Sequence, residues 1–342
     1  MRRSEWTNVV TLLLLSVIAL ISSTRAASVG KGNLKSTEHY IVNNRINSER
    51  YRVTTEDGYR LTVFRLVTKA PSRGVALLQH GMRSSSADWL QLNSNLPSQL
   101  LAAGFEVWVG NSRGSPESAG HNNLRNTSAD FWDFSFHEIG YYDLAAMIDA
   151  ALEKSHHKRI HLIGYSEGST AALVLLSERP SYGAKIASIN LIAPAAFMAN
   201  SQLKGVAQLY GKIERFFPWA AQSLNANGLI GNSRKALDHY RQLILSGRFQ
   251  KYDYGPPMNL QRYGTQQVPD YDLSRITLPM ALHFGELDPT VHPVDVRKLG
   301  QRLGRTTKVQ LIPYPSFKHY DFISRREATS IVYPLIVKIV SK

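Results

Sequence analysis

The chain has 342 residues, a formal net charge of +14 and no cysteine. Its hydrophobic content of 43% is enough for a large core and excludes a disordered protein. The absence of cysteine also excludes thiol catalysis and cysteine-ligated zinc.

The first 26 residues have the pattern of a secretory signal peptide. Two arginines precede a mostly apolar run over 9–21, and Thr24 and Ala26 stand where a signal peptidase expects small residues. A membrane anchor is the alternative, but a run this short spans a bilayer poorly. No later stretch is long and apolar enough to cross one. We therefore expect residues 1–26 to be removed and the chain to be secreted or lysosomal.

The basic charge and one sequence motif bear on where the chain acts. Its positive residues are scattered rather than clustered, which together with export argues against a nucleic-acid partner. A basic surface favours anionic lipid or polysaccharide, although most such charges simply face solvent. Asn126-Thr127-Ser128 is an acceptor pattern for N-glycosylation, which fits export.

The chain then alternates between strand-like and helix-like segments. Two strands are expected to meet at Asp57-Gly58, a dipeptide typical of hairpin turns. Short apolar runs predict buried strands, and segments with helical periodicity lie between them. The expected strands are 51–55, 60–68, 74–79, 105–109, 160–163, 186–192, 278–284 and 309–312. The expected helices are 89–103, 135–153, 167–177, 293–303 and about 326–340.

This order predicts an α/β fold with a mostly parallel sheet covered by helices and a leading antiparallel hairpin. The alternation stops between 198 and 275, which is too long for a plain loop. That region is rich in aromatic residues and helical in places. We predict a cap or lid at 198–275, inserted over the active site of a core made of 27–197 and 276–342.

Gly164-Tyr165-Ser166-Glu167-Gly168 directly follows the strand 160–163 and opens a helix rich in small residues. The spacing is typical of a sharp strand-to-helix turn that lifts a serine hydroxyl clear of the sheet. Glycines flank such a turn because side chains there would clash. The motif therefore indicates Ser166 as a nucleophile.

A serine nucleophile needs a base, and the base needs a carboxylate to orient it. At such a site the chain order is serine, acid, histidine. Asp288 follows the strand 278–284 and His319 follows the strand 309–312, so both are expected at the sheet edge that holds Ser166. Singly, Asp288 could cap the next helix and His319 could be an ordinary loop histidine. The occurrence of all three residues just after strands, in the expected chain order, favours a catalytic set.

Rival assignments are less well placed. Asp295 falls inside the expected helix 293–303, and His292 lies just before it. Metal-binding and dinucleotide-binding sites have little support, because the chain contains no HExxH and no GxGxxG motif. We expect neither a metal nor a cofactor.

His80-Gly81-Met82 immediately follows the strand 74–79. In hydrolases of this layout, one N–H of this loop and the N–H after the nucleophile stabilise the tetrahedral oxyanion. The expected donors are the backbone amides of Met82 and Glu167. The Glu167 carboxylate would repel the oxyanion if it points into the site, and would have no kinetic role if it is turned to solvent or held by a base. Both readings stay open.

At this point the chain resembles the acid lipase family, which includes gastric and lysosomal acid lipases. The resemblance covers most of the chain after residue 26. It is carried by Glu56-Asp57-Gly58-Tyr59, Leu78-Gln79-His80-Gly81, Gly110-Asn111-Ser112-Arg113-Gly114, Phe131-Trp132-Asp133-Phe134-Ser135-Phe136, Tyr142-Asp143-Leu144, Ser246-Gly247-Arg248-Phe249, Asp253-Tyr254-Gly255 and His319-Tyr320-Asp321-Phe322-Ile323. It implies the α/β-hydrolase fold and hydrolysis of triacylglycerols or sterol esters without metal or cofactor. It also implies the triad Ser166, Asp288 and His319.

The chain departs from that family in three ways. Tyr165 and Glu167 stand where the family usually has His and Gln, the cap is markedly shorter, and the family's cysteines are absent. The first two differences bear on substrate range and leave the triad intact.

We therefore predict a serine ester hydrolase, a lipase that meets lipid esters at a lipid–water interface, with no stable protein partner. A non-catalytic lipid carrier of the same fold would need none of the three residues. An esterase of small soluble esters is favoured by the short cap. An apolar face on 205–221, which contains Phe216, Phe217, Pro218 and Trp219, would favour a lipase, but the same residues could pack inward.

Overall fold

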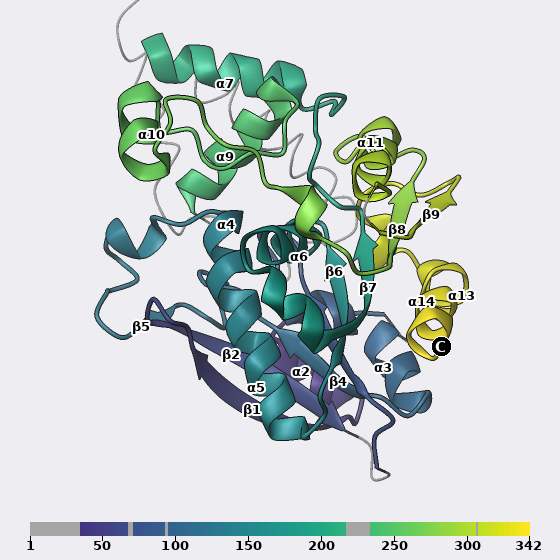
Figure 1. The fold of residues 1–342 in the computed structure, drawn as a ribbon. Coiled ribbons are helices and arrows are strands. Elements are labelled where there is room, and N and C mark those ends of the chain that lie inside the picture. Colours follow the sequence, from purple (N-terminus) through teal and green to yellow (C-terminus); the bar gives the residue numbers. More distant parts are fainter. Residues whose placement is uncertain (1–34, 68–70, 93–94, 217–232, 306) are drawn as a thin grey trace, which may run out of the picture.

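The computed structural model describes residues 35–342 except 68–70, 93–94, 217–232 and 306, so the predicted signal peptide lies outside the described residues. The strands are β1 Asn47–Thr54, β2 Tyr59–Val67, β3 Val75–Gln79, β4 Glu106–Gly110, β5 Gly120–His121, β6 Ile160–Tyr165, β7 Ile186–Ile192, β8 Met280–Gly285 and β9 Val309–Tyr314. They form one sheet in the order β1-β2-β4-β3-β6-β7-β8-β9, with β5 paired to β2 (Figure 1). The pairs formed by β2 are antiparallel, and every pair from β4 to β9 is parallel. The expected mostly parallel sheet with a leading hairpin is confirmed.

Helices cover both faces of the sheet. The longer ones in the core are α2 Thr37–Asn43, α3 Leu96–Ala102, α5 Ala145–Ser155, α6 Glu167–Glu178, α11 Pro293–Leu303 and α14 Tyr333–Val340. The central strand β3 is buried along its whole length. Its Val75 and Leu77 belong to one apolar cluster with α5 and α6, whereas Ala76 and Leu78 belong to another with α3 and α14. Because strand side chains alternate between faces, a strand covered on both sides must be apolar throughout.

Shorter helical segments complete the core. They are η1 Ser86–Leu90, η2 Asp130–Trp132, α4 Phe136–Glu138, the π-helical η3 Ile139–Leu144, η4 Pro180–Lys185, η5 Leu273–Arg275, α12 Asp321–Ser324 and α13 Ala328–Ile331. The expected helix 135–153 is present as α4, η3 and α5 in succession. A capping box starts it, because Ser135 accepts a hydrogen bond from a first-turn N–H and Glu138 bonds back to the Ser135 N–H.

Two predicted helices differ from the structure. The expected helix 89–103 is split, since α3 begins only after Asn95, whose side chain caps the Ser98 N–H, and Pro97 stands in its first turn. The expected helix 326–340 is divided into α13 and α14. Pro334 lies in the first turn of α14, where its missing N–H costs nothing, whereas inside one long helix it would remove a hydrogen bond.

Within the described residues, the region 198–275 carries the α-helices α7 Lys204–Phe216, α9 Arg234–Ser246 and α10 Pro256–Tyr263. Figure 1 shows them grouped beyond one end of the sheet, apart from the helices that flank its faces. Contact with the core includes a hydrogen bond of 3.1 Å from the Tyr240 hydroxyl of α9 to Thr170 Oγ1 of α6. The aromatic run Phe217-Pro218-Trp219, proposed for a lid, lies outside the described residues.

Candidate active site

The turn between β6 and α6 presents Ser166 at the carboxyl edge of the sheet. Ser166 has φ 50° and ψ −115°, a backbone conformation that L-residues rarely adopt. Its N–H donates to Ile192 O on the neighbouring strand β7 at 2.8 Å. A Cβ on Gly168 would lie 2.3 Å from Gln79 O, so only glycine lets the start of α6 approach the end of β3. The strained serine is therefore held between two strand ends.

Three polar side chains from three sheet-edge loops meet at this turn. The Ser166 Oγ lies 2.9 Å from His319 Nε2, and His319 Nδ1 lies 2.8 Å from Asp288 Oδ2. Because ionised Asp288 can only accept, His319 carries its proton on Nδ1 and leaves Nε2 free to accept from the serine hydroxyl. His319 and Asp288 are 7% and 2% exposed, so the hydrogen bonds that link Ser166, His319 and Asp288 are shielded from water. It can move a proton from Ser166 to His319.

Asp288 is itself held in place by backbone donors. Its Oδ1 accepts hydrogen bonds from the N–H groups of Thr290 at 2.8 Å and Val291 at 2.9 Å. The carboxylate thus both closes the turn after β8 and faces His319. The helix-capping role considered for this residue belongs to His292, whose ring accepts from the Val294 N–H at the start of α11.

The rival acid, Asp295, binds a different partner. Its two oxygens accept from the backbone N–H and the side-chain amide of Asn200, each at 2.8 Å. Asn200 stands at the start of the region 198–275. Asp295 therefore ties that region to α11 rather than orienting His319.

Tyr165, which precedes the serine, joins two parts of the site. Its hydroxyl donates to His319 O at 3.0 Å, and its ring centroid lies 5.4 Å from that of the imidazole. The tyrosine therefore fixes the backbone of the histidine loop relative to the serine turn. Sequence reasoning noted Tyr165 only as a departure from a family pattern, because nothing in a sequence shows where a hydroxyl points.

The loop after β3 reaches the serine closely. A Cβ on Gly81 would lie 3.1 Å from Ser166 Cβ and 3.2 Å from the Tyr165 ring. His80 fixes the loop, because its Nε2 accepts from the Ser112 N–H at 3.1 Å and its Nδ1 donates to Gly81 O at 2.7 Å. Burial lowers the pKa of His80 to about 4, so the ring stays neutral and keeps both bonds.

The two residues expected to supply oxyanion donors flank this approach. Met82 follows Gly81 and is partly buried against the main apolar cluster. Glu167 begins α6, and the first-turn N–H groups of a helix have no partner inside the helix. The N–H of Glu167 therefore has no partner inside α6, and the Met82 N–H stays an expected donor.

The Glu167 side chain is only 4% exposed, and its Oε1 has no hydrogen-bond partner among the described residues. Burial, and next the Asp143 charge, raise the pKa of this carboxyl to about 8. A carboxyl buried without a counter-charge avoids its desolvation cost by staying protonated. The carboxyl is neither turned to solvent nor held by a base, which contradicts the alternative that gave it no kinetic role on those grounds, whereas repulsion of the oxyanion stays a hypothesis.

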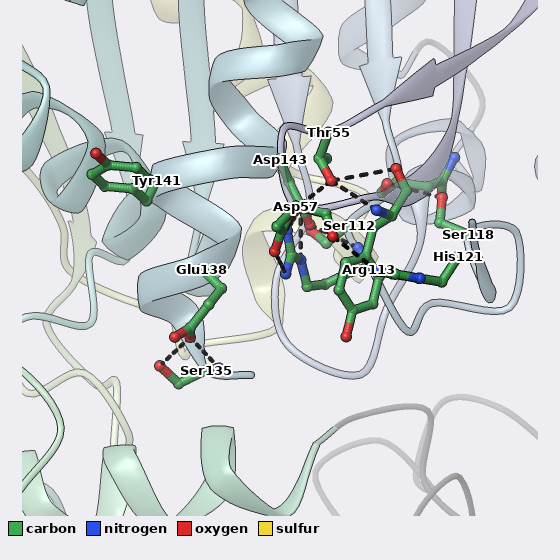
Figure 2. Close-up of polar contacts among 12 residues, drawn as sticks. Thr55, Asp57, Ser112, Arg113, Ser118, His121, Ser135, Glu138, Tyr141 and Asp143 are labelled. Carbon is green, nitrogen blue, oxygen red and sulfur yellow. Dashed lines mark hydrogen bonds and ion pairs between the residues drawn. The ribbon is translucent and has the colours of Figure 1, made fainter. Parts of the chain in front are cut away.

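A buried arginine connects three segments of the core, and Figure 2 shows Arg113 beside Asp57 and Asp143. The Arg113 guanidinium makes two hydrogen bonds to Asp57, of 2.6 and 2.9 Å, and its Nε donates to Asp143 Oδ1 at 2.7 Å. It also lies 3.9 Å from the centre of the Tyr59 ring. Arg113 thus joins the hairpin turn, the loop after β4 and η3. The sequence showed the motif that contains Arg113 but gave no sign that the residue is buried.

Three further features bear on the predictions. Within the described part of the chain, no group of three or more His, Cys, Asp or Glu side chains is arranged to hold a metal ion. No helix there has the length and apolar character needed to cross a bilayer. Asn126, the expected glycosylation site, is an exposed residue.

The chain matches two protein-family models and is similar to known lipases. Residues 75–325 match the family model described as alpha/beta hydrolase fold, and residues 37–93 match a partial alpha/beta-hydrolase lipase region. Lipase 1 of Drosophila melanogaster is 32% identical over 340 residues, covering 86% of this chain and 77% of that protein. Human gastric triacylglycerol lipase is 30% identical over 355 residues, covering 86% and 88%.

Solved structures show the same fold at lower sequence identity. An esterase from Pyrococcus furiosus superposes with a TM-score of 0.57 at 19% identity, covering 91% of this chain and 96% of its own. A bacterial membrane phospholipase A reaches 0.53 at 17% identity, with 99% of each chain covered.

Proposed function

We propose that this chain, which belongs to the α/β-hydrolase fold family and to the lipases within it, cleaves carboxylic esters of lipids with Ser166 as nucleophile. The observation that carries the proposal is the continuous hydrogen-bonded path from Ser166 through His319 to Asp288. The lipase names of the relatives support a lipid ester as substrate.

In the first half of the reaction Ser166 Oγ attacks the ester carbonyl carbon while His319 Nε2 takes the hydroxyl proton. Asp288 keeps the imidazole in the required tautomer and stabilises the imidazolium. The N–H groups of Met82 and Glu167 stabilise the oxygen anion of the tetrahedral intermediate. The C–O bond to the alcohol then breaks, and His319 gives its proton to the leaving alcohol.

The second half repeats these steps with water. His319 accepts a proton from a water molecule, whose oxygen attacks the acyl group on Ser166. The new tetrahedral intermediate collapses, the fatty acid leaves, and Ser166 regains its proton from His319. Each turnover consumes one ester and one water and releases one alcohol and one acid.

The region 198–275 is proposed as a cap that meets the lipid. It contains ten Lys or Arg against five Asp or Glu, and a net basic surface suits an interface carrying anionic lipid. The cap also bears on the alternative of an esterase for small soluble esters. Rates on a series of acyl chain lengths decide between them: a lipase is fastest on long, aggregated esters, an esterase on short, dissolved ones.

We also propose that residues 1–26 are a signal peptide and that the chain is secreted or lysosomal. The charged start, apolar run and small residues of that segment support this proposal. The exposure of Asn126 supports its use as a glycosylation site.

The test of the function is Ser166→Ala. Because the residue occupies a turn and fills no core volume, the variant is expected to fold and to lose roughly 10⁴-fold or more in kcat on esters of every chain length. Circular dichroism controls for folding. Substantial retained activity would exclude Ser166 as nucleophile, and lipid binding without turnover in the wild type would identify a carrier.

A further inference from the structure

A buried carboxyl beside the nucleophile has no role in the reaction as described. Glu167 directly follows Ser166, and its side chain is 4% exposed. Its Oε1 has no hydrogen-bond partner among the described residues. Acidic residues are rarely buried unless they are paired, and an unsatisfied buried oxygen costs stability. Because Glu167 is next to Ser166, which carries the reacting oxygen, a role in the reaction would explain why a buried, unpaired carboxyl is tolerated here.

The groups that face Glu167 give it no counter-charge. The charge that acts on it is that of Asp143 on η3, which is negative and raises the pKa of the carboxyl. The guanidinium of Arg113 is engaged by Asp57 and Asp143. From α9 the titratable group is Tyr240, whose hydroxyl donates to Thr170 on α6 itself.

We propose that Glu167 acts as a neutral carboxylic acid beside the oxyanion, and that its ionisation switches ester cleavage off at alkaline pH. The inference rests on the proposed function, because it concerns the oxyanion that Ser166 generates. Under this proposal Glu167 sets the pH above which the enzyme loses ester-cleaving activity. A glutamine at this position would have the same shape but would not ionise, so the activity would not be lost at that pH.

The physical reason is the distance between charges. The backbone N–H of Glu167 is a proposed oxyanion donor, so the buried carboxyl belongs to the same residue as a group that would hold the developing negative charge. A carboxylate there opposes that charge, and the repulsion is stronger in a site shielded from water. Because burial raises the pKa of Glu167 to about 8, the acid is neutral at and below neutral pH and ionises only above it.

The direction of the effect separates Glu167 from His319. A general base loses its proton as the pH rises, so its titration increases the rate. A decrease on the alkaline side therefore needs a different group. The tyrosines around the site do not supply it, because burial raises the pKa of both Tyr165 and Tyr240 well above the ordinary value of 10.

The experiment is the pH dependence of kcat/KM from pH 5 to 10, measured with a soluble short-chain ester on the full chain. Wild type, Glu167→Gln and a control, Glu178→Gln, are compared. Glu178 lies at the other end of α6 and pairs with Lys251 at 2.6 Å, away from Ser166. Wild type and control should lose about tenfold per pH unit above about pH 8, whereas the Glu167→Gln profile should stay level there.

Two outcomes overturn the inference. Superimposable profiles of wild type and Glu167→Gln mean that the carboxyl does not act on the reaction. Thermal unfolding is followed at each pH, and a wild type that is already unfolded at pH 9 would show that the loss is one of stability. If no variant, including wild type, cleaves any ester at pH 6, the proposed function itself has failed.

Discussion

At the scale of single residues, two aspartates follow β8 and both are almost fully buried. Asp288 is 2% exposed and Asp295 1%, so burial does not distinguish them. Their partners do, because Asp288 faces His319 and Asp295 faces Asn200. The difference arises from position: Asp288 lies in the loop at the sheet edge, and Asp295 is already in the first turn of α11.

We therefore expect Asp288→Asn to lower kcat by about 10⁴-fold, because an amide that donates to the imidazole stabilises the wrong tautomer. Asp295→Asn keeps an oxygen for the Asn200 N–H and should change kcat by no more than a few-fold. Steady-state kinetics on both variants measure the ratio. A larger loss at Asp295 than at Asp288 would overturn the assignment.

At the scale of elements, Arg113 joins three segments that are far apart in sequence. Its guanidinium donates to the carboxylates of Asp57 in the hairpin turn and of Asp143 in η3. The side chains of Arg113 and Asp143 are 1% and 0% exposed, so neither charge can be solvated if the other is removed. Breaking such a buried pair typically costs about 3–5 kcal/mol.

Arg113→Met should therefore lower the free energy of unfolding by about 3–5 kcal/mol, since two carboxylates lose their common partner. The matched control is Arg248→Met, because the Arg248 pair with Asp270 is about half exposed and should change stability by no more than about 0.5 kcal/mol. Urea denaturation of both variants gives the comparison. Equal stability changes would mean that the Arg113 network is not a structural junction.

The elements also show what could be predicted from the sequence. Buried strands were located to within a residue or two, because a strand covered on both faces must be a run of apolar residues. Helix boundaries were less accurate, since they depend on single residues such as Asn95 and Pro334. The short helix α2 and the two-residue strand β5 were missed, because neither is long enough to carry a periodic pattern.

The candidate site was predictable for a related reason. Ser166, Asp288 and His319 each follow a strand of the parallel part of the sheet, and parallel strands bring their carboxyl ends to one edge. The sequence could not show that Arg113 and Glu167 are buried, because charged residues are normally exposed and burial depends on segments distant in the chain.

At the scale of the whole molecule, the basic region 198–275 is expected to bind anionic vesicles more tightly as their anionic lipid content rises, and less tightly in salt. Lys204 and Arg262 are exposed basic residues of α7 and α10. Replacing both with Glu should weaken binding by about tenfold or more, at roughly 1 kcal/mol for each lost cation. Arg52→Glu with Arg60→Glu, on the distant hairpin, makes the same charge change and is the control. Equal effects of the two pairs would point to net charge alone.

The free energy of unfolding should have its maximum near neutral pH, because buried histidines lower it in acid and Glu167 lowers it in alkali. Burial lowers the pKa of His80 to about 4 and of His239 and His283 to about 3, so below pH 6.5 the unfolded chain binds protons that the folded chain does not. Stability is then lost as the pH falls. The raised pKa of Glu167 acts the other way, because the folded chain holds an extra proton between pH 4.5 and 8, so stability falls as the pH rises through that range.

Melting temperatures across pH 4 to 9 should therefore peak at about pH 6.5–7, where the loss of protons from the three unfolded-state histidines balances the extra proton on folded Glu167. Glu167→Gln should remove the alkaline decline and leave the acidic one. A wild-type melting temperature that keeps rising from pH 6.5 to 8 would contradict this account.

The strained backbone of Ser166 has a consequence for the history of the sequence. An L-residue held at φ 50° costs of order 1–3 kcal/mol, and glycine would adopt the same conformation without that strain. Random substitution screened only for soluble, folded product would therefore favour loss of the hydroxyl. A lineage that keeps serine at this position keeps a less stable fold than glycine would give, so only selection for turnover can maintain the serine.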